Sequence, residues 1–211
     1  MRISRTVLVS VLVLGFSSGT SWQWASAQGR PSAPELFERL RSDQTTNAAR
    51  KQLLDLGKSD PETRNYLAAQ LPLLIDLGPE SCPQTDTVDL VTRWHACPWY
   101  NAIELAGNLR IAEASPALAR WINWRVEGPL LPSIEAQLIF YPAAKALYEI
   151  GDPAIPVLQH ILNSSGGGEH AQAVRVLCKI RSVKAKAALS EQLAREADPG
   201  LRTMIKNAMR H

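Results

Sequence analysis

The stretch AAKALYEIGDPAIPVLQHIL, residues 143–162, decides the fold class of this chain. Small and large apolar residues recur in it at steps of three and four, which is typical of one buried face of a helix. Gly151 suits the positive φ that ends a helix, Asp152 suits the cap of the next helix, and Pro153 suits a first helical position. The stretch therefore predicts a helical hairpin with a very short turn.

Apolar anchor residues of such hairpins follow one another at a nearly regular spacing. Leu147 and Leu177 are 30 residues apart, and Leu177 and Ile205 are 28 apart. The interval from Leu105 to Leu147 is 42 residues, because a proline-rich link lies between them. A period of this kind is typical of stacked helix pairs, and no long alternating apolar-polar run indicates strands. We expect an all-α protein, an α-solenoid of about four or five antiparallel hairpins over residues 35–211, with an irregular insert at about 78–98.

Three short segments resemble a known family. Residues 143–158 resemble the HEAT-like repeat, in the short variety named after phycobilisome lyases. Asp60 with Arg64, and Asp198 with Arg202, are similar to the opening of that repeat, where we expect the aspartate to cap a helix and the arginine one turn later to pair with it. The resemblance implies an α-solenoid used for protein–protein contact. It implies no active-site residue, because the family shares none.

The first 27 residues have the features of a secretory signal peptide. Arg2 and Arg5 precede an apolar run, Val7–Phe16, that is about half as long as a bilayer span requires. Residues 25–27 form a small-x-small cleavage site. We expect cleavage after Ala27, an exported mature chain that is periplasmic or secreted, and a disordered leader over residues 28–34.

The charge balance argues against two classes of partner. Removal of Arg2 and Arg5 from the 23 basic residues leaves 21, against 20 acidic residues. No broad electrostatic field follows, so nucleic acid and an anionic membrane are poor candidates. We expect a protein or peptide partner, whereas the sequence is silent on the oligomeric state.

Three cysteines lie in the expected mature chain. In an exported protein a disulfide is favoured over a redox pair, and Cys82 and Cys97 flank a 14-residue insert whose closure contributes about 3 kcal/mol. Cys178 lies in a helical pattern and is interpreted as a buried small apolar residue rather than a nucleophile. His160, His170 and His211 are isolated in the sequence and are expected at the surface.

Aromatic residues gather in one segment of an otherwise aromatic-poor chain. Tryptophan and arginine are frequent hot-spot residues at interfaces, although the same residues also fill gaps between irregular repeats. The candidate partner-binding residues are Trp94, Trp99, Tyr100, Trp121, Trp124 and Arg125.

Two other functions remain open from the sequence. No catalytic motif is present, but a small envelope enzyme or lyase-like accessory factor remains an alternative if a concave cluster of ionisable groups forms. A metal-binding envelope protein centred on Cys82, His95 and Cys97 is a second alternative, although a fourth zinc ligand is missing. The leading expectation is a non-catalytic interaction module without a cofactor or metal.

Overall fold

The computed structural model of the chain describes residues 31–41, 46–82, 96–126, 138–164 and 167–210. The chain divides into a segment Met1–Pro31 and a compact unit Ser32–His211. Most of the expected irregular insert lies outside the described residues. No helix in the described ranges is long and apolar enough to cross a membrane.

The described part of the compact unit is helical, with ten α-helices, three short 3-10 helices and no strand. The α-helices are α1 (Ala33–Leu40), α2 (Thr46–Ser59), α3 (Pro61–Asp76), α5 (Pro98–Asn108), α6 (Ser115–Arg120), α8 (Pro142–Ile150), α9 (Ile155–Ser164), α10 (Gly168–Ile180), α11 (Val183–Arg195) and α12 (Pro199–Arg210). The 3-10 helices are η1 (Pro79–Ser81), η2 (Ala112–Ala114) and η3 (Asp152–Ala154).

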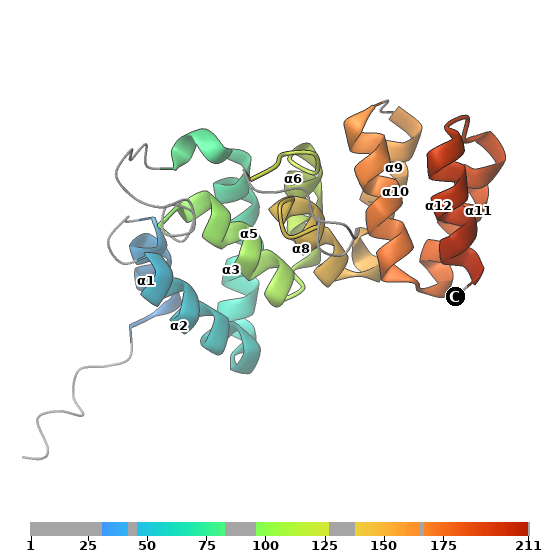
Figure 1. Ribbon diagram of the computed structural model, residues 1–211. Coiled ribbons are helices and arrows are strands. Elements are labelled where there is room, and N and C mark those ends of the chain that lie inside the picture. Colours follow the sequence, from blue (N-terminus) through green and yellow to red (C-terminus); the bar gives the residue numbers. More distant parts are fainter. Residues whose placement is uncertain (1–30, 42–45, 83–95, 127–137, 165–166, 211) are drawn as a thin grey trace, which may run out of the picture. The chain divides into compact units, whose positions relative to one another are not determined.

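These helices stack in sequence order as two layers (Figure 1). In the first layer each helix contacts the next in the order α2, α5, α8, α10 and α12. In the second layer each helix contacts the next in the order α3, α6, α9 and α11. Each hairpin thus covers the apolar stripe of the hairpin before it, which no single pair of helices can bury alone. The fold is the predicted all-α helical-repeat solenoid, with α1, four hairpins and a final single helix in the part of the chain that is described.

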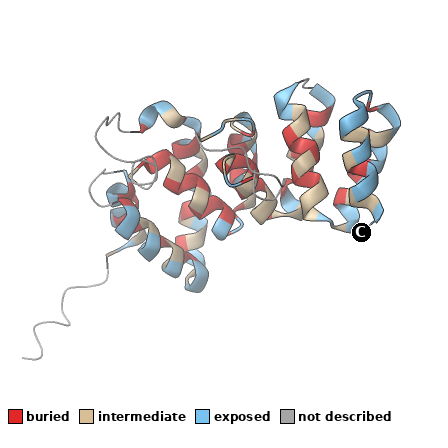
Figure 2. Ribbon diagram, in the orientation of Figure 1, coloured by how far each residue is buried: buried red, intermediate tan, exposed pale blue. Residues whose placement is uncertain are grey.

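The apolar anchors lie between the layers, where buried residues concentrate (Figure 2). The four residues whose spacing predicted the repeat are all buried, with exposed fractions of 1% for Leu105 and 0% for Leu147, Leu177 and Ile205. The regular spacing therefore reflects equivalent positions in successive first-layer helices. Removing any of them leaves a cavity in a contact between neighbouring repeats.

Several helix boundaries differ from the expectation for local reasons. Helix α1 begins at Ala33, inside the expected leader, because Ser32 and Glu35 form a capping box. Gly57 lies inside α2 rather than at its end, and it is buried against Leu109, where a Cβ would lie 2.8 Å from a methyl group. Gly151 has the expected positive φ of 80°, but the residues after it form η3, so α9 starts only at Ile155.

The arginine–aspartate pairing expected at the repeat openings is wrong. Asp60 caps α3 as expected, but Arg64 donates from Nη2 to the carbonyl oxygen of Arg110 at 3.3 Å. Arg202 likewise donates to the carbonyl oxygens of Leu193 and Glu196 at 2.9 and 2.7 Å. These carbonyls lie near helix ends and lack partners within their own helix, so the guanidinium groups are better used there. The repeat arginine thus joins one helix end to another.

Helix α11 does not bury every apolar residue that it carries. Val183 is 86% exposed, and Ala187 is exposed as well. The buried residues of this helix are instead Ala185, Ala188, Leu189 and Gln192. Gln192 enters the buried face because its amide is hydrogen-bonded to a polar cluster described below.

Candidate functional site

The aromatic segment forms part of the core rather than a free platform. Trp99 has no exposed surface, and its Nε1 donates to the carbonyl oxygen of Ile75 at 2.9 Å. The rings of Trp121 and Trp124 meet Trp99 edge-on, with ring centres 5.7 and 4.7 Å away. The prediction that Trp99 contacts a partner is wrong, because its ring fills the space where α5 meets α3. Trp94 lies outside the described residues.

The other aromatic-segment residues also take part in packing. Trp121 and Trp124 are half-buried against the core, and burial raises the pKa of Tyr100 to about 12. The guanidinium of the exposed Arg125 lies 5.6 Å from the ring centre of Phe140. A contact role for the exposed parts of these side chains stays a prediction.

Cys82 and Cys97 form a disulfide, with Cα atoms 4.7 Å apart. The pairing expected from the sequence is confirmed. Two cysteines joined in this way present no thiolate to a metal ion, and His95 lies outside the described residues. Burial raises the pKa of the Cys178 thiol to about 12, so that side chain stays a neutral thiol at physiological pH.

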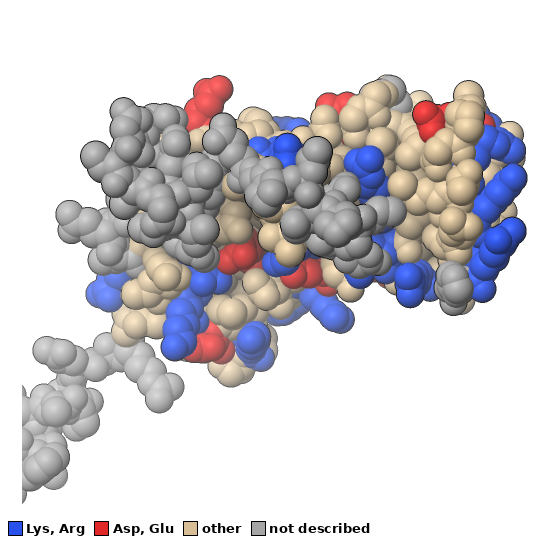
Figure 3. Space-filling view, in the orientation of Figure 1, with Lys and Arg blue, Asp and Glu red and all other residues tan. Residues whose placement is uncertain are grey.

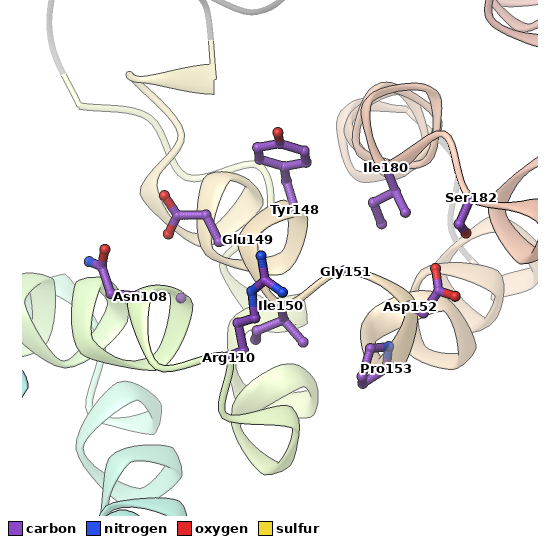
Figure 4. A pocket seen from close by; sticks show the side chains of 11 residues that line it. Asn108, Arg110, Tyr148, Glu149, Ile150, Gly151, Asp152, Pro153, Ile180 and Ser182 are labelled. Atoms are coloured by element: carbon purple, nitrogen blue, oxygen red, sulfur yellow. The ribbon is translucent and has the colours of Figure 1, made fainter. Parts of the chain in front are cut away.

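A groove of about 720 Å³ lies at the C-terminal ends of three consecutive first-layer helices. Helix α5 and the turn after it contribute one side, the end of α8 with η3 contributes the floor, and the end of α10 contributes the other side (Figure 4). The lining residues are Gly107, Asn108, Arg110, Tyr148, Glu149, Ile150, Gly151, Asp152, Pro153, Ile180 and Ser182.

The groove combines an apolar surface with separate charged groups. The Tyr148 ring and Ile180 stand on opposite sides of its opening, and the Arg110 guanidinium points between Tyr148 and Glu149 (Figure 4). The ammonium group of Lys179 lies 5.7 Å from the centre of the Tyr148 ring. Such a surface can contact an extended polypeptide that carries both apolar and charged side chains.

Glu149 is held at the edge of this groove. Its Oε1 lies 3.0 Å from the ammonium group of Lys145, so the carboxylate is neutralised within α8. Its Oε2 is buried and has no hydrogen-bond partner among the described residues. A Cβ on Gly107 would clash with this oxygen. Any larger residue at position 107 therefore displaces this carboxylate and the α5–α8 contact.

Residues 143–164 match the family model described as PBS lyase HEAT-like repeat. The protein contains a HEAT-like repeat. The matched repeat is the hairpin of α8 and α9, which also supplies the floor of the groove. Among solved structures, an engineered protein from a structural genomics consortium is 19% identical and matches over 86% of this chain and 96% of its own, with a TM-score of 0.27. No curated protein matches the chain.

The turns of three successive HEAT-like hairpins share a backbone feature. Gly151 follows α8 with φ 80°, while Arg110 and Arg181 follow α5 and α10 with φ 52° and 58°. A left-handed conformation is natural for glycine but disfavoured for arginine, and such exceptions concentrate at functional sites. The arginines flank the groove, Arg110 in its lining and Arg181 between the lining residues Ile180 and Ser182. Neither arginine stands out in the sequence alone, although alignment of the successive turns places both at the position of Gly151.

A second polar cluster joins the last repeats. His170 Nε2 lies 2.7 Å from Glu196 Oε2, and Gln192 Nε2 donates to the same oxygen at 2.9 Å. The amide of Asp198 donates to Glu196 Oε1 at 3.0 Å. Burial alone would raise the pKa of Glu196, but the hydrogen bonds from His170, Gln192 and Asp198 lower it to about 2. The expectation of an isolated surface His170 is wrong, because it contacts Glu196, which lies 26 residues further along the chain at the far end of the same hairpin.

The His170 cluster borders another open groove, of about 640 Å³, which also includes Arg175 and Met204. Among the described residues, no group of three or more His, Cys, Asp or Glu side chains has the geometry of a metal site. The charged groups near this groove are occupied mainly in joining α10, α11 and the start of α12.

Proposed function

We propose that the protein is an exported, non-catalytic interaction module whose HEAT-like hairpins bind an extended segment of a partner protein in the groove around Tyr148. The observation that carries the proposal is the groove itself, which three consecutive repeats build from their turn ends. A surface shared by adjacent repeats is the usual binding face of solenoid proteins. Its lining offers apolar, hydrogen-bonding and charged groups rather than a closed reaction chamber.

Two features support export. The N-terminal residues have the order of a signal peptide, with a basic start, an apolar run and Ala25-Ser26-Ala27. The Cys82–Cys97 disulfide is of the kind that forms in oxidising compartments. Mass spectrometry of the protein from its native cell tests this, because cleavage after Ala27 leaves Gln28 as the first residue. A full-length chain with free thiols would contradict export.

The binding proposal has a test with a matched control. Ile180 lines the groove, whereas Val183 is 86% exposed on α11 and lies outside the lining. Both are β-branched aliphatic residues, so Ile180→Ser and Val183→Ser make comparable changes. Peptides are selected from a random displayed library on the purified domain, and their affinities are then measured for both variants.

The expected result is a clear separation of the two variants. Ile180→Ser weakens the selected peptides by about tenfold, because an apolar contact is replaced by a hydroxyl. Val183→Ser leaves the affinity within about twofold. Equal effects of the two substitutions would show that the peptides bind elsewhere, and the proposal would be wrong.

The enzyme alternative has one location in its favour, the groove that contains His170 and Glu196. A general base works best with a pKa near the operating pH, but the pKa of Glu196 is lowered to about 2 by its hydrogen bonds. Its two oxygens are occupied by His170, Gln192 and the Asp198 amide. These contacts favour a structural role, and the interaction module remains the better supported function.

A further inference from the structure

The C-terminal repeats carry an excess of positive charge. Residues 168–210 contain nine lysines and arginines but only four acidic residues. Two of the four acidic residues make contacts within the protein. Glu196 pairs with His170, and Asp198 accepts a hydrogen bond from the amide of Leu201 and caps α12. Lys and Arg side chains accordingly follow the edge formed by α11 and α12 (Figure 3).

Four of these cations gather at one end of the terminal helices. Arg181 ends α10, Lys184 starts α11, and Lys206 and Arg210 lie in the second half of α12. All four are exposed, and none has a carboxylate within 4.0 Å in the described ranges. We call Arg181, Lys184, Lys206 and Arg210 the basic end.

Several cations of the earlier repeats pair with carboxylates. Arg50 pairs with Glu104 at 3.0 Å, Arg120 pairs with Asp76 at 3.1 Å, and Lys145 pairs with Glu149. Lys51, Lys58 and Arg110 have no carboxylate within 4.0 Å among the described residues. The basic end differs in bringing four such cations to one end of neighbouring helices, where their fields add.

The basic end is continuous with the groove. Arg181 lies between Ile180 and Ser182, which both line the groove, and Arg110 stands on the opposite side. A cation thus flanks the groove on either side, each on a turn in the left-handed conformation. Cations on both sides of the apolar Tyr148 and Ile180 favour a segment that carries both acidic and apolar residues.

Resting on the proposed function, we propose that the groove takes an acidic segment of a partner protein, whose carboxylates meet Arg110 and the basic end while an apolar side chain packs between Tyr148 and Ile180. Glu149 does not oppose this segment, because Lys145 neutralises it at 3.0 Å. Asp152 is the one acid of the lining without an ion pair among the described residues. It should weaken acidic segments, so Asp152→Asn should bind them more tightly.

A protein segment fits better than an anionic polymer. Nucleic-acid binding draws on a net positive field, whereas the chain after Ala27 is balanced at 21 basic and 20 acidic residues. A phosphate backbone has no apolar group that could pack against Tyr148, Ile180 and Pro153. It is matched by leucine or another apolar side chain of a short peptide.

The test uses three fluorescent 12-residue peptides with the same leucine positions, in which the alternate residues are glutamate, glutamine or lysine. We expect the glutamate peptide to bind, with an affinity that falls as salt rises, and the other two to bind at least tenfold more weakly. Arg181→Glu/Lys184→Glu should weaken the glutamate peptide by about tenfold or more. Lys51→Glu/Lys58→Glu is the matched control, because both lysines are exposed on α2 and the net charge changes equally.

The outcomes separate this inference from the proposed function. Library peptides that need Ile180 but are not acidic, and that bind Arg181→Glu/Lys184→Glu unchanged, would leave the groove function intact and overturn the acidic partner. Equal weakening by the α2 control would also overturn it, since any loss of net charge would then suffice. Binding of duplex DNA or of phosphatidylserine vesicles, without the glutamate peptide, would assign the basic end to a polyanion instead. If no peptide bound in the groove, both the proposed function and the acidic partner would be wrong.

Discussion

The indole N–H of Trp99 donates to the carbonyl oxygen of Ile75 at 2.9 Å, and this bond ties α5 to the last turn of α3. The carbonyl lies in the last turn of α3 and also accepts from the backbone amide of Gly78 at 3.2 Å, so Trp99 supplies an additional donor at this helix end. The Trp99 ring itself is fully buried between the edges of Trp121 and Trp124. One side chain thus closes a helix end and fills the core of the irregular region.

Trp99→Ala should therefore unfold or severely weaken the protein. We expect a loss of about 3–5 kcal/mol in the free energy of unfolding, because a large ring is replaced by a cavity. Trp99→Phe should lose about 1–2 kcal/mol, since most of the apolar ring remains but the hydrogen bond does not. Urea unfolding followed by circular dichroism measures both values. Loss of peptide binding by Trp99→Phe at unchanged stability would instead restore Trp99 as a contact residue.

Reduction of the Cys82–Cys97 disulfide should lower stability without touching the groove. The bond closes a 15-residue separation, and its loss is expected to lower the free energy of unfolding by about 3 kcal/mol. Thermal unfolding with and without a reductant measures the effect, and Cys82→Ser/Cys97→Ser should reproduce it. Cys97 caps the N-terminal end of α5, whereas the groove lies at its C-terminal end, so peptide affinity below the unfolding transition should not change. An unchanged melting temperature would show that the bond carries no stability.

Arg181→Gly and Arg110→Gly should stabilise the fold while weakening binding. Glycine removes the left-handed strain of an arginine with φ 58° or 52°, although it adds freedom to the unfolded chain. The expected net gain is about 0.5–1 kcal/mol in the free energy of unfolding. The same substitutions remove a cation beside the groove, so affinity for an acidic peptide should fall. Gly151→Ala, at the equivalent turn, should instead destabilise the protein, because φ is 80° there.

Acid should weaken the attachment of the last repeats through Glu196. Its pKa is lowered to about 2 in the folded protein from an ordinary value of 4.5, so the folded state binds the proton less readily than the unfolded state. The resulting stability is present above pH 4.5 and is lost as the pH falls from about 4.5 towards 2. Glu196→Gln should flatten this part of the stability profile and lower stability at pH 7 by about 1–2 kcal/mol. Glu191→Gln, at an exposed position of the same helix, should leave the profile as it is.

The helical repeat was predictable because its signal is local and periodic. The spacing alone indicates equivalent buried positions at Leu147, Leu177 and Ile205. The turn at Gly151 was equally readable, since its positive φ is a property of the residue itself. Such features depend on neighbours within one or two helical turns.

The candidate site was not predictable in the same way. Trp99 and Trp121 are close in the sequence whether their rings contact a partner or each other. Only the packing of α3 against α5 distinguishes these two cases. His170 and Glu196 meet because one helix end lies beside another, which no spacing in the chain reports. Arg110 and Arg181 flank one groove only because the turns after α5 and α10 lie on either side of the turn at Gly151, which the sequence alone does not show.

The most direct test of the account maps the contact of the bound peptide by nuclear magnetic resonance. Amide shifts of the ¹⁵N-labelled domain are recorded with and without the glutamate peptide. We expect the largest changes at Arg110, Gly151 and Ser182, around the groove formed by three turns. Changes centred on Trp124 and Arg125, with the groove amides unmoved, would contradict the account and return the binding surface to the aromatic segment.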